Sequence, residues 1–215
     1  MTRLDIISDP ICPWCAIGKA NLDGALRQRP GHGLDIFWHP FQLNPDMPPE
    51  GMDRAEYLAL KFGGKEGAVR VYSQIETAAQ DAGLTFNFAA ITRTPNTLNA
   101  HRLIYWAGQE DRQETVTTAL FEAYFSHGRD ISNLDVLTSI AKDAGMDAPA
   151  VARLLASDAM VGEIQALDRD FRARGVGGVP CFIADNHYVV QGAQPSSLWL
   201  RVIDEIGHAP QALAT

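Results

Sequence analysis

Two cysteines stand close together near the start of the chain, in the segment Cys12-Pro13-Trp14-Cys15. The sequence has three cysteines in all, and the third, Cys181, lies near the other end. Two close thiols can form a structural disulfide, supply half of a metal site, or react as a dithiol pair. These possibilities differ in what else the sequence must contain.

The rest of the sequence disfavours the first two possibilities. A structural zinc site usually combines two close pairs of ligands, and the chain has no second Cys-x-x-Cys and no His-x-x-x-His. We therefore predict no metal site. A chain of 215 residues, 46% of them hydrophobic, is long enough to bury a core of its own and needs no disulfide staple.

The two cysteines are placed for thiol-disulfide exchange. Pro13 suits the first turn of a helix, and apolar residues recur at near-helical spacing as far as Leu26. The unpaired N–H groups and the positive end of this helix favour the thiolate of Cys12. We expect Cys12 to be exposed and to attack a disulfide, and Cys15, more buried and protonated, to resolve the mixed disulfide.

The elements around this pair follow an α/β order. Apolar runs predict strands at residues 3–8 and 34–41, and residues 53–174 have helical periodicity with no β segment between them. Residues 175–195 return to β character as a hairpin, with Asp185 and Asn186 at its turn, and an amphipathic helix closes the chain. We therefore predict one α/β domain from residues 1–45 and 175–215, with residues 46–174 as an all-helical insertion.

A second candidate site lies in the glycine-rich segment before the hairpin, residues 175–180. The Val179-Pro180 step between a turn and a strand is a plausible place for a cis peptide bond. Beside Cys12, the backbone of Val179 would pair with an extended substrate segment as an added strand. The alternative is an ordinary proline at the start of an edge strand.

Charge and hydropathy exclude two classes of partner. The net charge of −8 argues against nucleic acid, because affinity for phosphates depends on clustered Lys and Arg. No apolar run approaches the length of about 18 residues that a membrane span needs. The N-terminal MTRLDIISDP is too short and too polar for a signal-peptide core, so we expect a cytoplasmic protein.

Four blocks of sequence carry a family resemblance: DPICPWCAIGKANLDGAL, WHPFQLNPDMPPEG, RTPNTLNAHRL, and GVGGVPCFI with the following VVQGAQP. In this order they resemble the DsbA-like thioredoxin-fold family, specifically its FrnE-type branch. The resemblance implies a thioredoxin fold with a helical insertion, Cys12 as nucleophile, Cys15 as resolving thiol and Pro180 as a cis-proline. Two residues depart from the branch, namely Ala16 in place of an aromatic residue and Cys181 in place of threonine.

The implied function is that of a thiol-disulfide oxidoreductase that needs no metal or organic cofactor. Its partners would be protein or small-molecule disulfides and thiols, glutathione among them. The same superfamily includes glutathione-dependent isomerases and kappa-type glutathione transferases, which act on aromatic substrates and typically have Ser at the first catalytic position. The presence of both cysteines favours dithiol chemistry. A non-catalytic binding module of the same fold is a third possibility.

Several further residues have two interpretations each. Trp14, between the cysteines, must lie at the site if the site is real, and Phe41 and Trp106 would either join it in an apolar rim or lie in the core. Asp9 would either carry a proton for Cys15 or end a strand.

For two other residues we favour a structural role. A lone histidine on a helix, as His101 is, usually serves packing or solvation. Cys181, at the start of a strand, is either a buried core residue or a third thiol near the pair.

Overall fold

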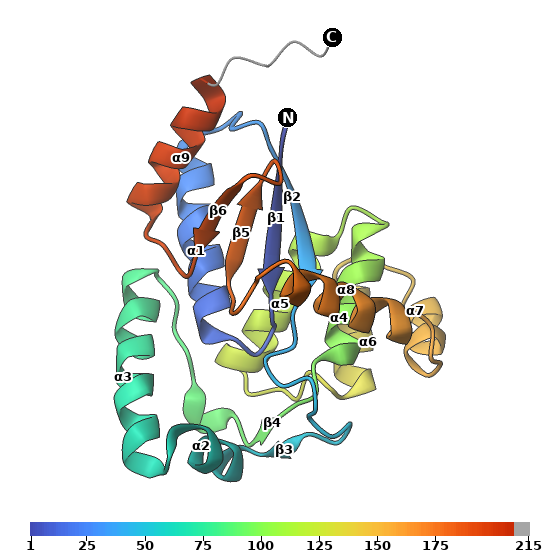
Figure 1. Cartoon of the computed structure of the whole chain (residues 1–215). Coiled ribbons are helices and arrows are strands. Elements are labelled where there is room, and N and C mark those ends of the chain that lie inside the picture. The colour runs from blue at the N-terminus through green and yellow to red at the C-terminus, as the bar shows by residue number, and fades with distance from the viewer. Residues whose placement is uncertain (209–215) are drawn as a thin grey trace.

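A four-stranded sheet forms the centre of the protein, whose computed structural model describes residues 1–208 (Figure 1). Its strands, in the spatial order β2-β1-β5-β6, are β1 (Thr2–Ser8), β2 (Leu34–Pro40), β5 (Cys181–Ala184) and β6 (Tyr188–Gln191). β1 is parallel to β2 and antiparallel to β5. The parallel pair requires a crossover, which α1 (Pro13–Gln28) supplies. Both strands and the helix that were predicted for the N-terminal segment are therefore present.

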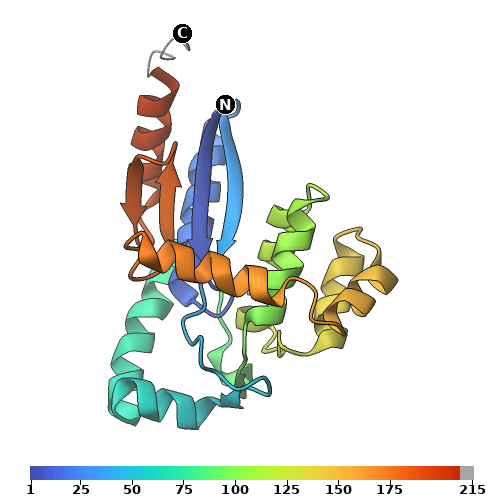
Figure 2. The same ribbon diagram turned by 45° about the vertical axis from the view of Figure 1, so that its right-hand side comes forward.

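The two faces of the sheet are covered by different helices. Side chains alternate along a strand, and Leu4 and Ile6 of β1 join the core cluster that includes residues of α1 and α9 (Ser196–His208). Ile7 belongs to a second cluster, which Phe171 of α8 (Val161–Ala173) also joins. Figure 2 shows α8 crossing one face while α1 lies behind the sheet. This arrangement is a thioredoxin fold, as predicted.

The C-terminal hairpin has the turn that the sequence indicates. β5 and β6 are antiparallel, with Ala184 paired to Tyr188. Asp185 and Asn186 between the strands both have positive φ angles, of 47° and 59°, which a tight hairpin turn favours and which Asp and Asn tolerate. The last seven residues of the predicted 175–215 segment lie outside the described residues.

Helices make up most of the chain between the two halves of the sheet. They are α2 (Arg54–Phe62), α3 (Lys65–Asp81), α4 (Leu98–Gly108), α5 (Gln113–Phe121), α6 (Leu134–Asp143), α7 (Ala148–Leu155) and α8, with a 3-10 turn at Phe88–Ala90 and a π-helical turn at Glu122–Ser126. Among the described residues, no helix is both long enough and apolar enough to cross a bilayer.

The prediction that no β segment interrupts this helical region is wrong in one detail. Two short strands, β3 (Met52–Asp53) and β4 (Arg93–Thr94), pair antiparallel. Strands of two residues are too short to produce an alternating pattern that sequence periodicity can detect. They fasten the start of α2 to the segment that precedes α4.

Aromatic side chains join the helical region to the sheet. Trp38 of β2 packs edge-on against Phe121 of α5, with ring centroids 6.4 Å apart. Phe121 in turn stacks on Phe125, and Phe86 lies 4.7 Å from the same ring. These aromatic residues belong to the same cluster as the core on the α1 face of the sheet, so the helical region and the sheet share one hydrophobic core.

Candidate active site

Cys12 occupies the N-cap position of α1, as the sequence predicts. Its backbone is extended (φ −87°, ψ 112°), and Pro13 follows as the first helical residue. The Cys12 carbonyl accepts hydrogen bonds from the N–H groups of Cys15 (3.0 Å) and Ala16 (3.3 Å). Cys12 therefore stands at the positive end of the α1 dipole.

The segment before β5 comes close to this sulfur. The Val179–Pro180 peptide bond is cis, as the resemblance implies. The Cys12 thiol donates a hydrogen bond to the Val179 carbonyl, with 3.6 Å between Sγ and the oxygen. Two segments that are 167 residues apart in the sequence thus meet at one sulfur.

A glycine in α1 permits this approach. A Cβ atom at Gly18 would stand 3.1 Å from Cγ of Pro180 and 3.3 Å from the ring of Phe182. Both distances are shorter than ordinary van der Waals contact. The absence of a side chain at position 18 therefore lets α1 pack directly on Pro180.

Burial of the two thiols differs from the expectation. Cys12 is only 3% exposed, and Cys15 is 1% exposed, so the prediction of an exposed Cys12 is wrong. The helices α2 and α3 lie over the start of α1 and, with the segment around Val179, enclose the sulfur in a pocket. Sequence periodicity identifies helices but does not say which surface they cover.

Cys15 holds its proton firmly. Burial raises the pKa of the Cys15 thiol well above its ordinary value, and the neighbouring Cys12 adds to the increase. Ser8 and the backbone of Asp9 partly oppose this effect. At neutral pH Cys15 is therefore a neutral thiol beside the Cys12 sulfur.

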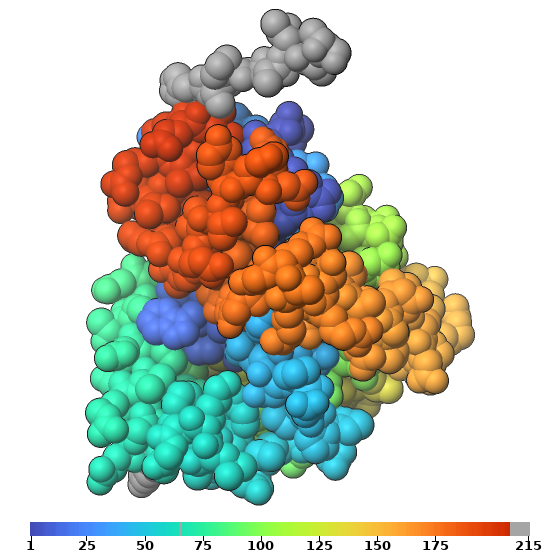
Figure 3. Space-filling model, in the orientation of Figure 1, coloured from blue at the N-terminus to red at the C-terminus, as the bar shows by residue number. Residues whose placement is uncertain are grey.

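The pocket over Cys12 has a volume of about 280 Å³. Trp14 and Val179, which we expect to bind substrate, line it together with side chains from α2 and α3. In Figure 3, atoms coloured as the start of α1 emerge between the teal α2–α3 segment and the orange C-terminal elements. Residues of these three segments line the pocket, and the segments meet at the surface of the molecule.

The aromatic rim of the pocket is not the one that the sequence suggested. Phe41 is buried with Ile7 and Phe171 in the core on the α8 face of the sheet. Trp106 packs against Arg102, whose Cζ atom lies 5.0 Å from the ring centroid. Neither residue lines the pocket, so both have the structural role that was the alternative interpretation.

The helical region instead supplies lining residues that sequence reasoning missed. They include Arg54, Tyr57, Lys61, Tyr72 and Tyr124. One signal was available: Arg54, Tyr57 and Lys61 are spaced three and four residues apart, which places them on one face of a helix. Nothing in the sequence tied that face to Cys12.

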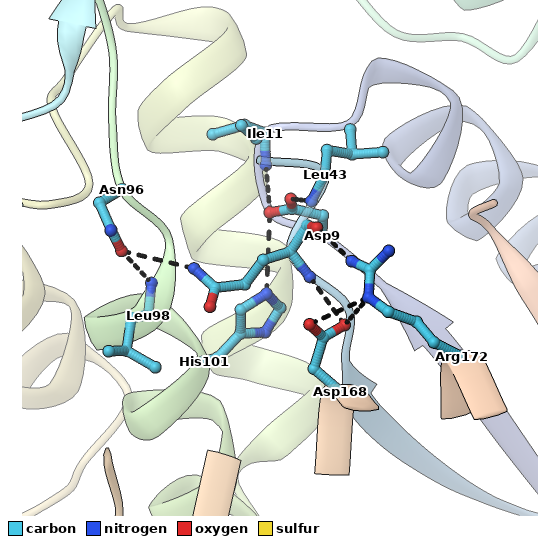
Figure 4. A network of polar contacts seen from close by, with 9 residues as sticks. Asp9, Ile11, Leu43, Asn96, Leu98, His101, Asp168 and Arg172 are labelled. Atoms are coloured by element: carbon cyan, nitrogen blue, oxygen red, sulfur yellow. Dashed lines mark hydrogen bonds and ion pairs between the residues drawn. The ribbon is translucent and has the colours of Figure 1, made fainter. Parts of the chain in front are cut away.

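Asp9 fastens the loop before Cys12 to the loop after β2. Its carboxylate accepts hydrogen bonds from the N–H groups of Ile11 (3.3 Å) and Leu43 (2.7 Å) (Figure 4). The side chain is completely buried, and this burial raises its pKa to about 7, although the two hydrogen bonds oppose the shift. These bonds give the carboxylate a structural role in placing Cys12.

His101 approaches the same carboxylate from α4. Its Nε2 atom lies 3.7 Å from Oδ1 of Asp9, too far for a hydrogen bond, and has no other partner among the described side chains. Burial lowers the pKa of His101 to about 3, so the ring is uncharged at neutral pH. The contact is therefore not an ion pair, and His101 does not contact the reacting sulfurs.

Cys181 belongs to the other face of the sheet. It is fully buried and packs with Ile7 and Phe171 on the α8 side, whereas Cys12 and Cys15 belong to the core on the α1 side. The Gln191 side chain donates a hydrogen bond to its sulfur at 3.2 Å. Burial raises the pKa of the Cys181 thiol. Cys181 is thus a core residue and not a third member of the pair.

The fold and this site together define the class of the protein. A β2-β1-β5-β6 sheet, a Cys-x-x-Cys at the start of α1 and a cis-proline before β5 are arranged as in thioredoxin-like proteins. Residues 3–203 match the family described as DSBA-like thioredoxin domain, and the chain belongs to this family.

Three relatives illustrate the similarity. The crystal structure of the probable DsbA oxidoreductase SCO1869 from Streptomyces coelicolor has a TM-score of 0.87 and 29% identity, and the match covers 100% of this chain and 94% of that one. The uncharacterized protein YwbO of Bacillus subtilis (strain 168) is 24% identical over 94% of this chain and 96% of its own. The cytosolic disulfide reductase DsbM from Pseudomonas aeruginosa, solved with GSH, shares the fold, with a TM-score of 0.68, 20% identity and coverage of 95% and 98%.

Proposed function

We propose that the protein is a thiol-disulfide oxidoreductase that cycles Cys12 and Cys15 between the dithiol and the disulfide. The observation that carries this proposal is the asymmetry of the pair. Cys12 stands at the N-terminus of α1 and lines the pocket, whereas Cys15 is not part of that lining and burial keeps it protonated. Cys12 is thus placed to attack a substrate disulfide, and Cys15 is placed to resolve the mixed disulfide that forms.

Reduction of a substrate disulfide then takes two exchanges. The Cys12 thiolate attacks one sulfur of the substrate, the substrate S–S bond breaks, and one substrate thiolate leaves. Cys15 loses its proton and attacks Sγ of Cys12, which breaks the mixed disulfide and releases the second substrate thiolate. The substrate gains two electrons, the pair is oxidised, and the proton of Cys15 passes to a departing thiolate. An external dithiol restores the pair.

Val179 offers a place for the substrate backbone. Among the described residues, no hydrogen bond uses the Val179 N–H, and the side chain is only half-buried. An extended substrate segment beside Cys12 would accept from this N–H in the manner of an added strand. We assign Val179 and Trp14 to substrate binding and Pro180 to the positioning of Val179.

Partners of this chemistry are protein or small-molecule disulfides and thiols. The DsbM structure holds GSH and its name describes a cytosolic disulfide reductase, which supports glutathione as a candidate partner and a cytoplasmic location for this chain. Within the family, we assign the chain to the FrnE-type branch on the four sequence blocks that resemble it. No cofactor enters the proposed cycle.

Equilibration of the pair with glutathione tests the proposal. Purified protein is incubated in buffers of varied glutathione to glutathione-disulfide ratio, and the Cys12–Cys15 disulfide is counted by alkylation and mass spectrometry. Reduction of insulin and of bis(2-hydroxyethyl) disulfide, with dithiothreitol as reductant, is then compared with the Cys12→Ser variant. The proposal requires a titratable pair and turnover that depends on Cys12. A pair that never cycles, with turnover equal to that of Cys12→Ser, contradicts it.

A second candidate, a glutathione-dependent isomerase or kappa-type transferase, is favoured by one observation. The pocket over Cys12 is lined by the aromatic rings of Trp14, Phe62 and Tyr72, which suit an aromatic substrate. This function would require glutathione as a bound partner rather than as an electron donor. Conversion of an aromatic substrate that needs glutathione but does not need Cys15 would favour it.

A further inference from the structure

A buried arginine lies in the pocket with Cys12. Arg54, the first residue of α2, is only 8% exposed. Its Nη1 donates to the Tyr124 hydroxyl at 3.0 Å and its Nη2 to the Tyr72 hydroxyl at 2.6 Å. A buried arginine usually has a partner of opposite charge or a set of carbonyl acceptors, as Arg102 has in this protein.

No such partner is present among the described residues. None of their ion pairs includes Arg54, and both of its hydrogen-bond partners are neutral phenols. The Tyr124 hydroxyl in turn donates to the Arg93 carbonyl at 3.3 Å. The two bonds use two of the five N–H donors of a guanidinium, so the charge is held in place but not neutralised.

The rest of the pocket has the same charge bias. Among the described residues that line the pocket, Arg54 and Lys61 are charged, and none is Asp or Glu. The whole sequence is acidic, with 26 Asp and Glu against 18 Lys and Arg. A cavity lined by positive charge in an acidic protein concentrates anions.

The arginine is close to the reacting sulfur. Cys12, Arg54 and Tyr72 line one pocket. Burial is the main reason that the pKa of Tyr72 is raised, and the charge of Cys12 adds to the increase. Because all three groups line one pocket, one small ligand can contact both the sulfur and the guanidinium.

A purely structural role explains Arg54 less well. The guanidinium links α2 to Tyr72 of α3 and to Tyr124 of the π-helical turn. A neutral donor such as glutamine can join two hydroxyls without the free-energy cost of a buried, unpaired charge. That cost is offset when an anion binds.

We propose that Arg54 binds a carboxylate of the substrate, so that the pocket selects disulfides of small thiols that carry a carboxylate group. This inference rests on the proposed oxidoreductase function and names its substrate class. A planar carboxylate accepts two parallel N–H bonds from a guanidinium. The pocket volume of about 280 Å³ and the near-complete burial of Cys12 fit a small disulfide.

Three disulfides of matched length test the charge selection. They are bis(2-carboxyethyl), bis(2-hydroxyethyl) and bis(2-aminoethyl) disulfide, which end in an anion, a neutral group and a cation. The rate at which the reduced protein reacts with each is divided by the rate with dithiothreitol alone, which removes intrinsic reactivity. We expect the normalised rate for the carboxylate to exceed that for the hydroxyl by roughly 10- to 100-fold, the range of a charge-assisted hydrogen bond. The cation should react slowest.

Variants then assign the preference to Arg54. Arg54→Met should bring the carboxylate-to-hydroxyl ratio close to one, while Arg54→Lys keeps part of the preference. Arg70→Met is the control for net charge, because Arg70 is exposed on α3 and outside the pocket, and its ratio should equal that of the wild type. If Arg54→Met does not fold, Tyr72→Phe, which removes one hydroxyl that positions the guanidinium, should lower the ratio instead.

The outcomes distinguish a failure of this inference from a failure of the proposed oxidoreductase function. Equal normalised rates for the three disulfides in the wild type overturn the inference on their own, while the oxidoreductase function stands. A full preference that persists in Arg54→Met, or one lost equally in Arg70→Met, also overturns it. Failure of all three disulfides to oxidise the pair instead contradicts the proposed function.

Discussion

The Cys12 sulfur lies 3.6 Å from the carbonyl oxygen of Val179. This contact joins the start of α1 to the segment before β5, the two parts of the chain that carry the candidate chemistry. A bond to the Cys12 sulfur replaces the thiol proton, so this hydrogen bond is lost when a mixed disulfide forms. Because Cys12 and Val179 also line one pocket, a substrate in that pocket meets the sulfur and the Val179 backbone together.

The order of the two exchanges can be observed by removing the second thiol. In Cys15→Ala the Cys12 thiolate still attacks, but nothing resolves the mixed disulfide, so the adduct should accumulate to about one per chain. Mass spectrometry after incubation with glutathione disulfide measures it. Cys12→Ser should form no such adduct, and Cys181→Ala, altered on the other face of the sheet, should behave as the wild type. An adduct on Cys181 in the Cys15→Ala protein would contradict the assignment.

The main elements of the fold could be predicted because local signals agree there with the tertiary structure. Pro13 marks the start of α1, and the Asp185-Asn186 turn marks the hairpin, and the structure has both. Such signals depend on backbone preferences within a few residues. The cis bond at Pro180 followed from the resemblance, since sequence alone does not distinguish the isomers.

The pocket could not be predicted from the sequence, because segments that are far apart along the chain form its lining. Its lining includes Arg54 and Tyr72, which are far from Cys12 in the sequence and reach it only because α2 and α3 fold back over α1. Arginine is normally exposed, so nothing in the sequence indicated a buried Arg54. The same packing buries Cys12 itself and explains why its expected exposure was wrong.

Even a methyl side chain at position 18 should destabilise the protein, although Gly18 lies within a helix. Replacing a helical glycine by alanine usually stabilises by about 1 kcal/mol, but at Gly18 the new Cβ meets Pro180 and the packed ring of Phe182. We expect Gly18→Ala to lower the free energy of unfolding by about 1 kcal/mol, because overpacking outweighs the helix preference. Urea unfolding measures it. Gly162→Ala in α8, where a Cβ meets nothing within 4 Å, is the control and should stabilise.

Arg102 should contribute strongly to the stability of the helical region. Its guanidinium donates to the carbonyls of Leu154 (2.6 Å) in the last turn of α7 and of Ser157 (2.6 Å) and Ala159 (2.8 Å) just after it. Arg102→Met removes all three bonds and leaves the Ser157 and Ala159 carbonyls without this donor, while the Leu154 carbonyl still accepts from Ser157. The free energy of unfolding should fall by about 3 kcal/mol. Thermal and urea unfolding test this. The exposed Arg153 of α7 provides the control, and an equal loss in Arg153→Met would show that charge rather than these bonds is responsible.

Asp9 and His101 give opposite contributions to the pH dependence of stability. The pKa of Asp9 is raised to about 7 in the folded protein, against about 4 when unfolded. Between these values the folded state holds more protons, so this contribution falls as pH rises. The pKa of His101 is lowered to about 3, against about 6.5 when unfolded. Here the unfolded state holds more protons, so this contribution rises with pH.

In the wild type these two contributions largely cancel between about pH 4 and 6.5, and single substitutions should separate them. Asp9→Asn should gain stability relative to the wild type as pH rises from about 4 to 7, because the cost of ionising a buried carboxyl is gone. His101→Gln should lose relative stability as pH rises from about 3 to 6.5. Each difference should reach a few kcal/mol. Urea unfolding at pH steps across this range measures both differences. If the stability of each variant changes with pH in parallel with that of the wild type, neither group is perturbed by its burial.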